Sequence, residues 1–193
     1  MIQYPLVVVL LLLSALASSH IRCGAVAAAA AMDASYVAVV STVLRGASTV
    51  IDVAIDGGGH LLYITSTGGI VYRLLSQSSS GASQTVASGF SYPTSITCDT
   101  VNNVTYVADT GYYRIRRIDL SNSNAVTTFA GGTAGYQDGT GTTARFLNLA
   151  GIVYHHSSGG VVYVADGNYI RKIIVANASV SILHRRKFVL TFA

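Results

Sequence analysis

The chain has 193 residues, about half of them apolar and a tenth charged. This length suits one domain or slightly more, and this composition builds a hydrophobic core, which excludes a disordered tail. Three of its twelve basic residues, Arg185, Arg186 and Lys187, stand together near the C-terminus, so the rest of the chain is nearly neutral despite a net charge of +4. A basic surface for nucleic acid is therefore not expected.

The N-terminus carries a targeting signal. Residues 6–17 are apolar apart from Ser14 and end in Ala15-Leu16-Ala17. This length and this ending are typical of a signal peptide, whereas a helix that spans a bilayer needs about twenty apolar residues. We expect residues 1–17 to be a cleaved hydrophobic helix and residues 18–36 to be an Ala-rich linker. A second apolar run at 24–32 leaves an uncleaved membrane anchor open as the alternative.

Secretion changes how the asparagines and cysteines are interpreted. Asn103 and Asn177 each begin an Asn-x-Ser/Thr triplet in an expected turn and are glycosylation candidates. Cys23 and Cys98 are too few for a disulfide framework. Cys98 lies in an apolar strand and is expected to be a buried thiol, with a Cys23–Cys98 disulfide as the alternative.

A tyrosine recurs in three similar stretches: Tyr63 in LLYITS, Tyr106 in TYVADT and Tyr163 in VVYVAD. The intervals are about 43 and 57 residues, and a period near 40 indicates a propeller or a helical array. Within each unit, apolar or alternating runs of about four to six residues break at Gly, Asn and Ser, which is typical of strands.

Each unit divides into four expected strands joined by hairpins. First strands fall at 51–56, 95–99 and 151–155; second strands at 61–66, 104–109 and 161–166; third strands at 71–74, 115–118 and 170–173; fourth strands at 84–88, 125–130 and 179–183. A further fourth strand is expected at 39–44. Four antiparallel strands make a propeller blade, so the predicted fold class is all-β.

The predicted blades cover about residues 49–90, 94–132 and 149–184, within a repeat region of 37–184 that precedes a basic and apolar tail at 185–193. Closed propellers take about four to eight blades, so three blades predict an incomplete propeller. A Gly- and Thr-rich insert at 131–146 separates the second and third blades and ends in a run that suits one helical turn.

The motif YVADTGYYRIRRI, repeated as YVADGNYIRKI, resembles the repeat of the NHL family of β-propellers. The stretch 130–152, with its DGTG turn and ARF ending, resembles that family's linker between blades. The first unit departs from the pattern, with Ser66 in the place of the aspartate. The residues that match the repeat motif are Tyr63, Tyr106, Asp109, Arg116, Tyr163, Asp166 and Arg171. The resemblance implies four-stranded blades around an axis, with partners bound on the faces that loops line.

The charged motif residues are expected to have structural roles. Asp109 and Asp166 end their strands before a glycine turn, where an aspartate caps the turn through the backbone two residues on. Arg114, Arg116, Arg117 and Arg171 alternate with isoleucine, so they are expected to face solvent or to pair with neighbouring carboxylates. A ring of arginines that faces a ligand is the alternative.

The sequence predicts no catalytic residue, cofactor site or metal site. The loop Asp138-Gly139-Thr140-Gly141 offers Ca²⁺ a single carboxylate, which is too little charge. His155 and His156 are adjacent on a strand, so their side chains point to opposite faces and cannot grip one metal ion. A nucleophile elbow, an HExxH helix and a phosphate-binding P-loop are all missing from the sequence.

The preferred hypothesis is a non-enzymatic scaffold that binds an unknown protein or small ligand, in the secretory pathway or outside the cell. Open blade edges also allow self-association, and membrane contact is expected only if the N-terminal segment stays uncleaved. One alternative is a metal-dependent lyase-like enzyme, since secreted relatives cleave peptidyl-hydroxyglycine on this propeller. The other alternative is a truncated gene fragment without independent function.

Overall fold

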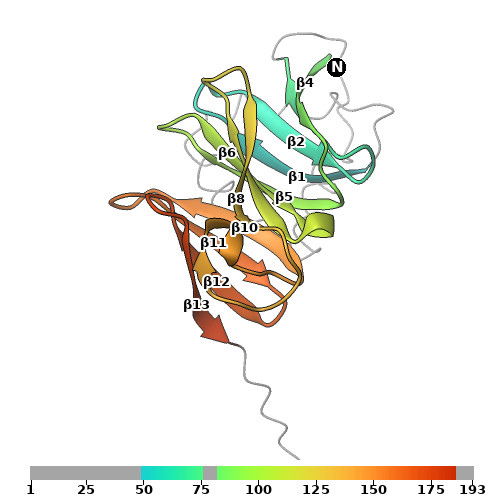
Figure 1. The fold of residues 1–193 in the computed structure, drawn as a ribbon. Helices are drawn as coiled ribbons and strands as arrows, with labels where there is room; N and C mark the ends of the chain where they lie inside the picture. The colour runs from blue at the N-terminus through green and yellow to red at the C-terminus, as the bar shows by residue number, and fades with distance from the viewer. Residues whose placement is uncertain (1–48, 76–81, 186–193) are drawn as a thin grey trace, which may run out of the picture. The chain divides into compact units, whose positions relative to one another are not determined.

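The computed structural model describes residues 49–75 and 82–185, whose strands form one compact unit (Figure 1). The predicted signal peptide, the Ala-rich linker, the extra strand at 39–44 and the tail from residue 186 onward lie outside the described residues. Nothing in the described part therefore tests these predictions.

Three antiparallel sheets follow one another along the chain. Blade 1 contains β1 (Val50–Ile55), β2 (Leu61–Thr65), β3 (Ile70–Leu74) and β4 (Ser83–Ser88). Blade 2 contains β5 (Pro93–Asp99), β6 (Val104–Asp109), β7 (Arg114–Asp119) and β8 (Ala125–Gly131). Blade 3 contains β10 (Leu149–His155), β11 (Val161–Asp166), β12 (Tyr169–Ile174) and β13 (Ser179–Arg185). The predicted all-β fold of four-stranded blades is confirmed.

The chain between blades 2 and 3 is ordered by short elements of its own. The two-residue strand β9 (Gly139–Thr140) pairs with β13 and so becomes a fifth strand of the third sheet. The 3₁₀ turn η3 (Gly141–Thr143) follows, and it supplies the helical turn expected in this insert. A second 3₁₀ turn, η2 (Thr110–Tyr112), connects β6 to β7.

The register of the three sheets corrects the alignment of the first repeat. Each first strand carries an irregularity at the same place: between Val50 and Asp52, Pro93 and Ser95, and Leu149 and Gly151. Val50 pairs with Thr65, as Pro93 pairs with Asp109 and Leu149 with Asp166. Thr65 therefore occupies the aspartate position, and Leu62 occupies the position of Tyr106 and Tyr163. The sequence alignment on Tyr63 and Ser66 was wrong by one residue.

The blades pack face to face through two apolar clusters. Leu62, Ile64 and Val71 of blade 1 meet Ile96, Val107 and Ile118 of blade 2. On its other face, blade 2 packs Tyr106, Ala108 and Ile115 against Ile152, Val164 and Ile173 of blade 3. Because both faces of blade 2 are covered, every residue of β6 is buried. The two clusters together form the core.

The first strands of successive blades lie next to one another, β1 against β5 and β5 against β10. Polar groups connect them. The Asp52 carboxylate oxygen Oδ2 accepts hydrogen bonds from Ser95 Oγ at 2.6 Å and from the Ile96 amide at 2.9 Å. Ser95 Oγ in turn accepts a hydrogen bond from the Ile152 amide at 3.1 Å. A continuous polar relay therefore crosses all three blades.

Candidate functional site

Antiparallel pairing gives each blade two ends. The loop end holds the turns between second and third strands, at residues 66–69, 110–113 and 167–168, and the connections between blades, at 89–92 and 131–148. The middle of the second connection, β9, runs to the start of β13 near the other end. The turn end holds the hairpins between first and second strands, at residues 56–60, 100–103 and 156–160. Every predicted site residue can be placed relative to these two ends.

Asp109 and Asp166 lie at the loop end, fully buried, and bind the incoming connections rather than their own turns. Asp109 Oδ1 accepts a hydrogen bond from the Ser91 amide at 2.6 Å. Asp166 Oδ1 accepts hydrogen bonds from the Leu147 and Asn148 amides at 3.0 and 2.8 Å. The expectation that they cap the turn two residues on was wrong, because the carboxylates accept amides of the preceding connection, and the Gly111 and Gly167 amides donate to the carbonyl oxygens of Ser91 and Asn148. Their role is still structural.

Arg171 is buried completely, in contrast to the solvent-facing alternative expected for the arginines. Its guanidinium contacts Asp166 at 3.2 Å and Asp138 at 2.8 Å, and it donates to the carbonyl oxygens of Arg145 and Gln137. The ring of Phe146 lies 5.3 Å away. Arg171 therefore fixes the connection between blades 2 and 3, and the predicted pairing with carboxylates is correct for it.

The other arginines also find partners inside the protein. Arg114 Nε donates to Asp109 Oδ2 at 2.7 Å, and Arg117 contacts Asp119 at 3.0 Å. Arg116 donates to Thr128 Oγ1 at 2.8 Å, and burial lowers the pKa of its guanidinium. In blade 1, Tyr72 occupies the position that Arg116 and Arg171 hold in the other blades. Tyr72 pairs with Tyr63, whereas Arg116 pairs with Val107 and Arg171 with Val164. The three blades thus do not present one shared ring of arginines.

The repeat tyrosines belong to the packing between strands. Tyr63 stacks on Tyr72, with ring centroids 5.1 Å apart, and its hydroxyl donates to Ser83 Oγ at 2.8 Å. Tyr106 is 1% exposed and packs on Phe129 and Tyr154. Tyr163 lies on the outward face of blade 3 and is half-buried. None of the three reaches the loop end.

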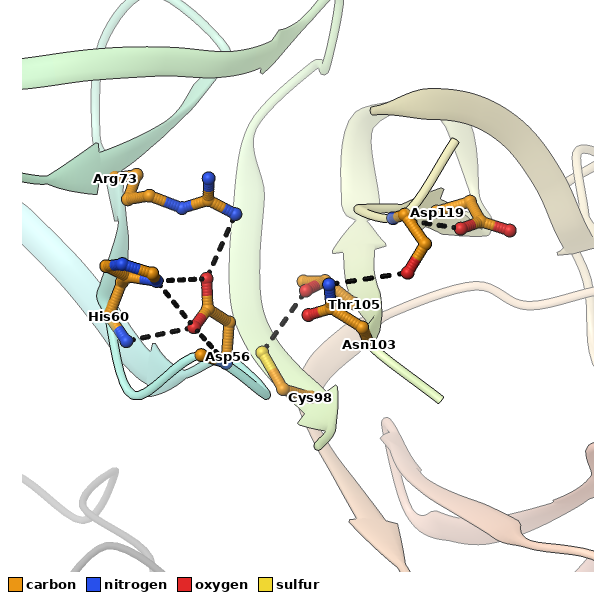
Figure 2. Close-up of polar contacts among 9 residues, drawn as sticks. Asp56, His60, Arg73, Cys98, Asn103, Thr105 and Asp119 are labelled. Carbon is orange, nitrogen blue, oxygen red and sulfur yellow. Dashed lines mark hydrogen bonds and ion pairs between the residues drawn. The ribbon is translucent and has the colours of Figure 1, made fainter. Parts of the chain in front are cut away.

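A polar cluster at the turn end centres on Asp56, whose side chain is 1% exposed (Figure 2). His60 Nδ1 lies 3.1 Å from Asp56 Oδ1, and Arg73 NH2 lies 3.0 Å from Asp56 Oδ2. The same carboxylate accepts hydrogen bonds from the Gly58 and His60 amides, both at 2.9 Å. These contacts close the β1–β2 hairpin and attach it to β3. Asp56 is therefore a turn residue at the end of β1.

The corresponding carboxylate of blade 2, Asp99, caps its hairpin through the Val101 and Asn102 amides, both at 3.1 Å. Desolvation raises its pKa, but the hydrogen bonds from Asn102, Tyr154 and Val101 outweigh this and lower the pKa overall. Burial and the bond to Asp99 raise the pKa of Tyr154 to about 12. Asp99 is thus a turn residue at the end of β5.

Cys98 is a free, partly buried thiol in the structure, and Cys23, its partner in the alternative disulfide, lies outside the described residues. Its Sγ lies 3.2 Å from Thr105 Oγ1 (Figure 2). Burial raises the pKa of the Cys98 thiol to about 12. A thiol that stays protonated at neutral pH is a poor nucleophile, which favours the predicted structural role.

Among the described residues, no group of three or more His, Cys, Asp or Glu side chains could hold a metal ion. Asp138, the carboxylate of the DGTG loop, faces the Arg171 guanidinium instead of an open cage. His155 ends β10 and His156 begins the following turn. In the same part of the chain, no helix is long and apolar enough to cross a membrane.

The two glycosylation candidates differ in exposure. Asn177 is exposed in the turn between β12 and β13, and its Oδ1 accepts a hydrogen bond from the Ser179 amide at 3.0 Å. Asn103 is partly buried at the turn end, with its Nδ2 3.4 Å from Ser121 Oγ and its Oδ1 shielded from solvent. Glycosylation itself stays a prediction.

Exposed tyrosines gather at the loop end, and the sequence analysis did not single them out. Tyr92 is 78% exposed, Tyr112 51% and Tyr136 42%. The Arg114 guanidinium lies 4.5 Å above the Tyr112 ring, and the rings of Tyr136 and Tyr169 are 4.7 Å apart. Their positions in the sequence could have indicated them: they stand in predicted loops, whereas the alternation of strands accounts only for buried aromatic residues.

The backbone at the loop end is strained in two places. Tyr92 and Tyr113 have φ of 47° and 53°, in the left-handed region where a side chain costs about 1 kcal/mol or more. The neighbouring carboxylates hold this backbone, because Asp109 binds the Ser91 amide next to Tyr92. Left-handed residues also occur at the turn end, at Asn103, Ser123, Asn124 and Ala178. The exposed tyrosines, rather than strain, therefore mark the loop end as the candidate binding surface.

No protein-family model matches the chain, and no curated protein matches it either. Solved structures do match. They include an auxiliary nutrient binding protein from Bacteroides ovatus, at 15% identity and a TM-score of 0.57 over 69% of this chain and 35% of that chain. A nidogen/laminin complex matches at 17% identity and a TM-score of 0.60, over 75% of this chain and 52% of that chain.

Virginiamycin B lyase from Staphylococcus aureus matches at 17% identity and a TM-score of 0.53, over 72% of this chain and 42% of that chain. The chain thus spans between a third and a little over half the length of these proteins. The matched structures are β-propeller-like, and at these identities the similarity shows the fold alone. The chain has the fold of an incomplete β-propeller.

Proposed function

We propose that this chain is a non-enzymatic propeller scaffold of the NHL-repeat type that binds a protein partner at its loop end. The observation that carries the proposal is the set of exposed tyrosines at the loop end. Tyrosine and arginine are enriched in protein interfaces, where a rigid aromatic side chain contributes contact area at little entropic cost. The neighbours include a nutrient binding protein and a laminin complex, which supports a binding role without naming the partner.

Buried charged side chains fix the loops at the loop end, which favours specific recognition over loose contact. The Asp109 carboxylate clamps the connection that carries Tyr92, and Asp166 with Arg171 clamps the connection that carries Tyr136. A preorganised surface loses less conformational entropy on binding. The tyrosines are therefore positioned before a partner arrives.

A binding screen tests this function. The full chain would be probed against an arrayed library of secreted and cell-surface proteins, beside a Tyr92→Ala/Tyr112→Ala variant. Val101→Ala is the matched control, because Val101 is 69% exposed at the opposite, turn end. We expect a partner whose affinity falls at least about tenfold, or 1.4 kcal/mol, in the tyrosine variant and stays unchanged in the control.

Partners that bind the tyrosine variant as well as the parent chain would overturn the proposal. If the screen finds no protein partner and a small ligand binds at the loop end instead, the proposed protein partner is wrong and the chain is a scaffold for that ligand. Turnover of that ligand by the chain would support the enzyme alternative.

We also propose that the chain acts in the secretory pathway or outside the cell. Residues 6–17 and the two Asn-x-Ser/Thr triplets support this location. Expression in secretory cells should release a chain that begins after Ala17, and glycosidase treatment should reduce its mass. Asn177→Gln should remove the mass shift, since Asn177 is the exposed acceptor. Retention in the membrane fraction with an intact N-terminus would favour the uncleaved anchor instead.

A further inference from the structure

Successive blades of this chain pack through a joint, which is the contact between one defined face of each blade. The trailing face of a blade packs on the next blade, and the leading face packs on the previous one. Leu62 and Ile64 lie on the trailing face of blade 1, and they meet Ile96 and Val107 on the leading face of blade 2. The joint between blades 2 and 3 uses the corresponding positions. The structure therefore contains the same joint twice.

Strand β1 on the leading face of blade 1 has the chemistry of a joint and lies open. Tyr63 of β2, at the position of Val107 and Val164 on the same face, is already buried. Val53 holds the position of Ile96 and Ile152, as the aligned irregularities of the first strands establish. Ile96 and Ile152 are 3% and 2% exposed, whereas Val53 is 41% exposed. Ile55, two residues on along the same face, is 45% exposed. An apolar side chain stands where the internal joints bury one.

The trailing face of blade 3 is open in the same sense. Ile170 pairs with Ala165, as Ile115 pairs with Ala108 and Val71 with Ile64. Val71 and Ile115 are fully buried, whereas Ile170 is 43% exposed. Ile174 on this face is 38% exposed.

The cation Lys172 on this face does not prevent packing. Lys172 holds the position of Arg73 and Arg117. It pairs with Tyr163, whereas Arg73 pairs with Leu62 and Arg117 with Tyr106. Both arginines lie on trailing faces that internal joints cover. A basic side chain at this position is therefore compatible with a joint.

We infer that a second copy of this chain covers these faces, with its blade 1 packed on blade 3 of the first copy in head-to-tail fashion. The chain itself carries both halves of one further joint, and the new contact continues the joints already present between its blades. Two copies related by a twofold axis form two such joints and bring together six described blades. That number falls within the range of about four to eight blades found in closed propellers.

The joint between copies lacks one bond that the internal joints have. Asp52 and Ser95 each accept the amide of the next blade, Ile96 and Ile152 respectively. Gly151 holds their position in blade 3 and has no side chain to offer. The joint between copies is thus weaker than the internal ones, and the dimer dissociates on dilution.

The test measures the mass of the full chain by light scattering and sedimentation over a range of concentrations. We expect a dimer that dissociates in the micromolar range. Val53→Lys and Ile170→Lys should each weaken the dimer at least about a hundredfold, because a charge would be buried without a partner. Val101→Lys is the control, because Val101 is exposed on the turn end and lies on neither blade face.

A mixture of the two variants identifies the geometry. A head-to-tail joint needs one intact leading face and one intact trailing face, so each lysine variant alone is a monomer. Their mixture restores one joint, from the trailing face of the Val53→Lys chain and the leading face of the Ile170→Lys chain. We therefore expect a heterodimer in the mixture.

Three results would overturn the inference. A parent chain that stays monomeric at about 100 µM, far above a micromolar dissociation constant, means that another segment or partner covers these faces. A dimer that survives one of the two substitutions means a symmetric contact between like faces. A dimer that Val101→Lys also disrupts means a different surface.

Discussion

At the scale of single residues, each blade contains a buried aspartate paired with an arginine. Asp56 pairs with Arg73 in blade 1, Asp109 with Arg114 in blade 2 and Asp166 with Arg171 in blade 3. All three carboxylates are at most 3% exposed and accept backbone amides as well as the guanidinium. The pairs therefore hold turns and connections.

Replacing Asp166 tests this structural role. Asp166→Asn would leave the buried Arg171 guanidinium without its buried counter-ion, so we expect unfolding free energy to fall by about 3 kcal/mol. Guanidinium chloride unfolding measures the change. Asp119→Asn is the matched control, because Asp119 and Arg117 form an ion pair that is 23% and 33% exposed. Such a pair contributes about 1 kcal/mol or less. Equal effects of both substitutions would contradict the buried clamp.

A second prediction at this scale concerns the Cys98 thiol. Its pKa, raised by burial to about 12, leaves almost no thiolate at pH 8. In a Cys23→Ser background, alkylation of the folded chain should be at least about a thousandfold slower than that of the unfolded chain in urea. Comparable rates would mean that Cys98 is an accessible, reactive thiol.

The same shift has a consequence for stability. The folded chain holds the thiol proton more tightly than the unfolded chain, whose cysteine titrates near pH 9. The contribution to stability is therefore complete below about pH 9 and is lost as the pH rises toward 12. Cys98→Ala should remove this part of the alkaline loss, which denaturant unfolding at several pH values measures.

At the scale of elements, the sequence predicted the strands because glycine, asparagine and serine interrupt short apolar runs at regular intervals. It did not fix the register of blade 1, since the run Leu61 to Ile64 does not alternate and either Leu62 or Tyr63 suits the tyrosine position. It did not predict the burial of Arg171, because the partner Asp138 is 33 residues away in the chain. The loop-end tyrosines follow no period, so alternation could not indicate them.

A pair of glycines tests how tightly the blade connections pack. Gly69 and Gly59 both have positive φ, of 54° and 78°. A Cβ on Gly69 would overlap the carbonyl oxygen of Phe90, whereas a Cβ on Gly59 would meet nothing within 4 Å. We expect Gly69→Ala to lower the free energy of unfolding by at least about 2 kcal/mol more than Gly59→Ala. Because both substitutions carry the same kind of backbone strain, a smaller difference would show that the β4–β5 connection adapts.

At the scale of the molecule, three blades behave as a short array whose stability depends on its joints. The apolar clusters at the two joints are separate, with blade 2 contributing one face to each. The polar relay from Asp52 through Ser95 to the Ile152 amide is continuous across both. Ser95 thus couples blade 1 to blade 3, although no apolar cluster of the residues that the structure describes joins these two blades.

A double-mutant cycle measures that coupling. Ser95→Ala removes a hydrogen bond to a carboxylate and leaves the Ile152 amide without its acceptor, so we expect a loss of about 2 kcal/mol in unfolding free energy. Asp52→Ala removes the other end of the same bond. The double variant should therefore lose about 1 kcal/mol less than the sum of the two single losses. All unfolding curves are recorded at one protein concentration, because assembly would otherwise shift them.

Thr97 provides the control for the cycle. Its Oγ1 accepts the Tyr154 amide at 3.0 Å, across the same joint between blades 2 and 3, but it makes no bond to Asp52. Thr97→Ala and Asp52→Ala should therefore be additive within about 0.5 kcal/mol. Additivity in the Ser95 cycle as well would mean that the two joints stabilise the array independently. Coupling confined to Ser95 would mean that the first strands connect all three blades.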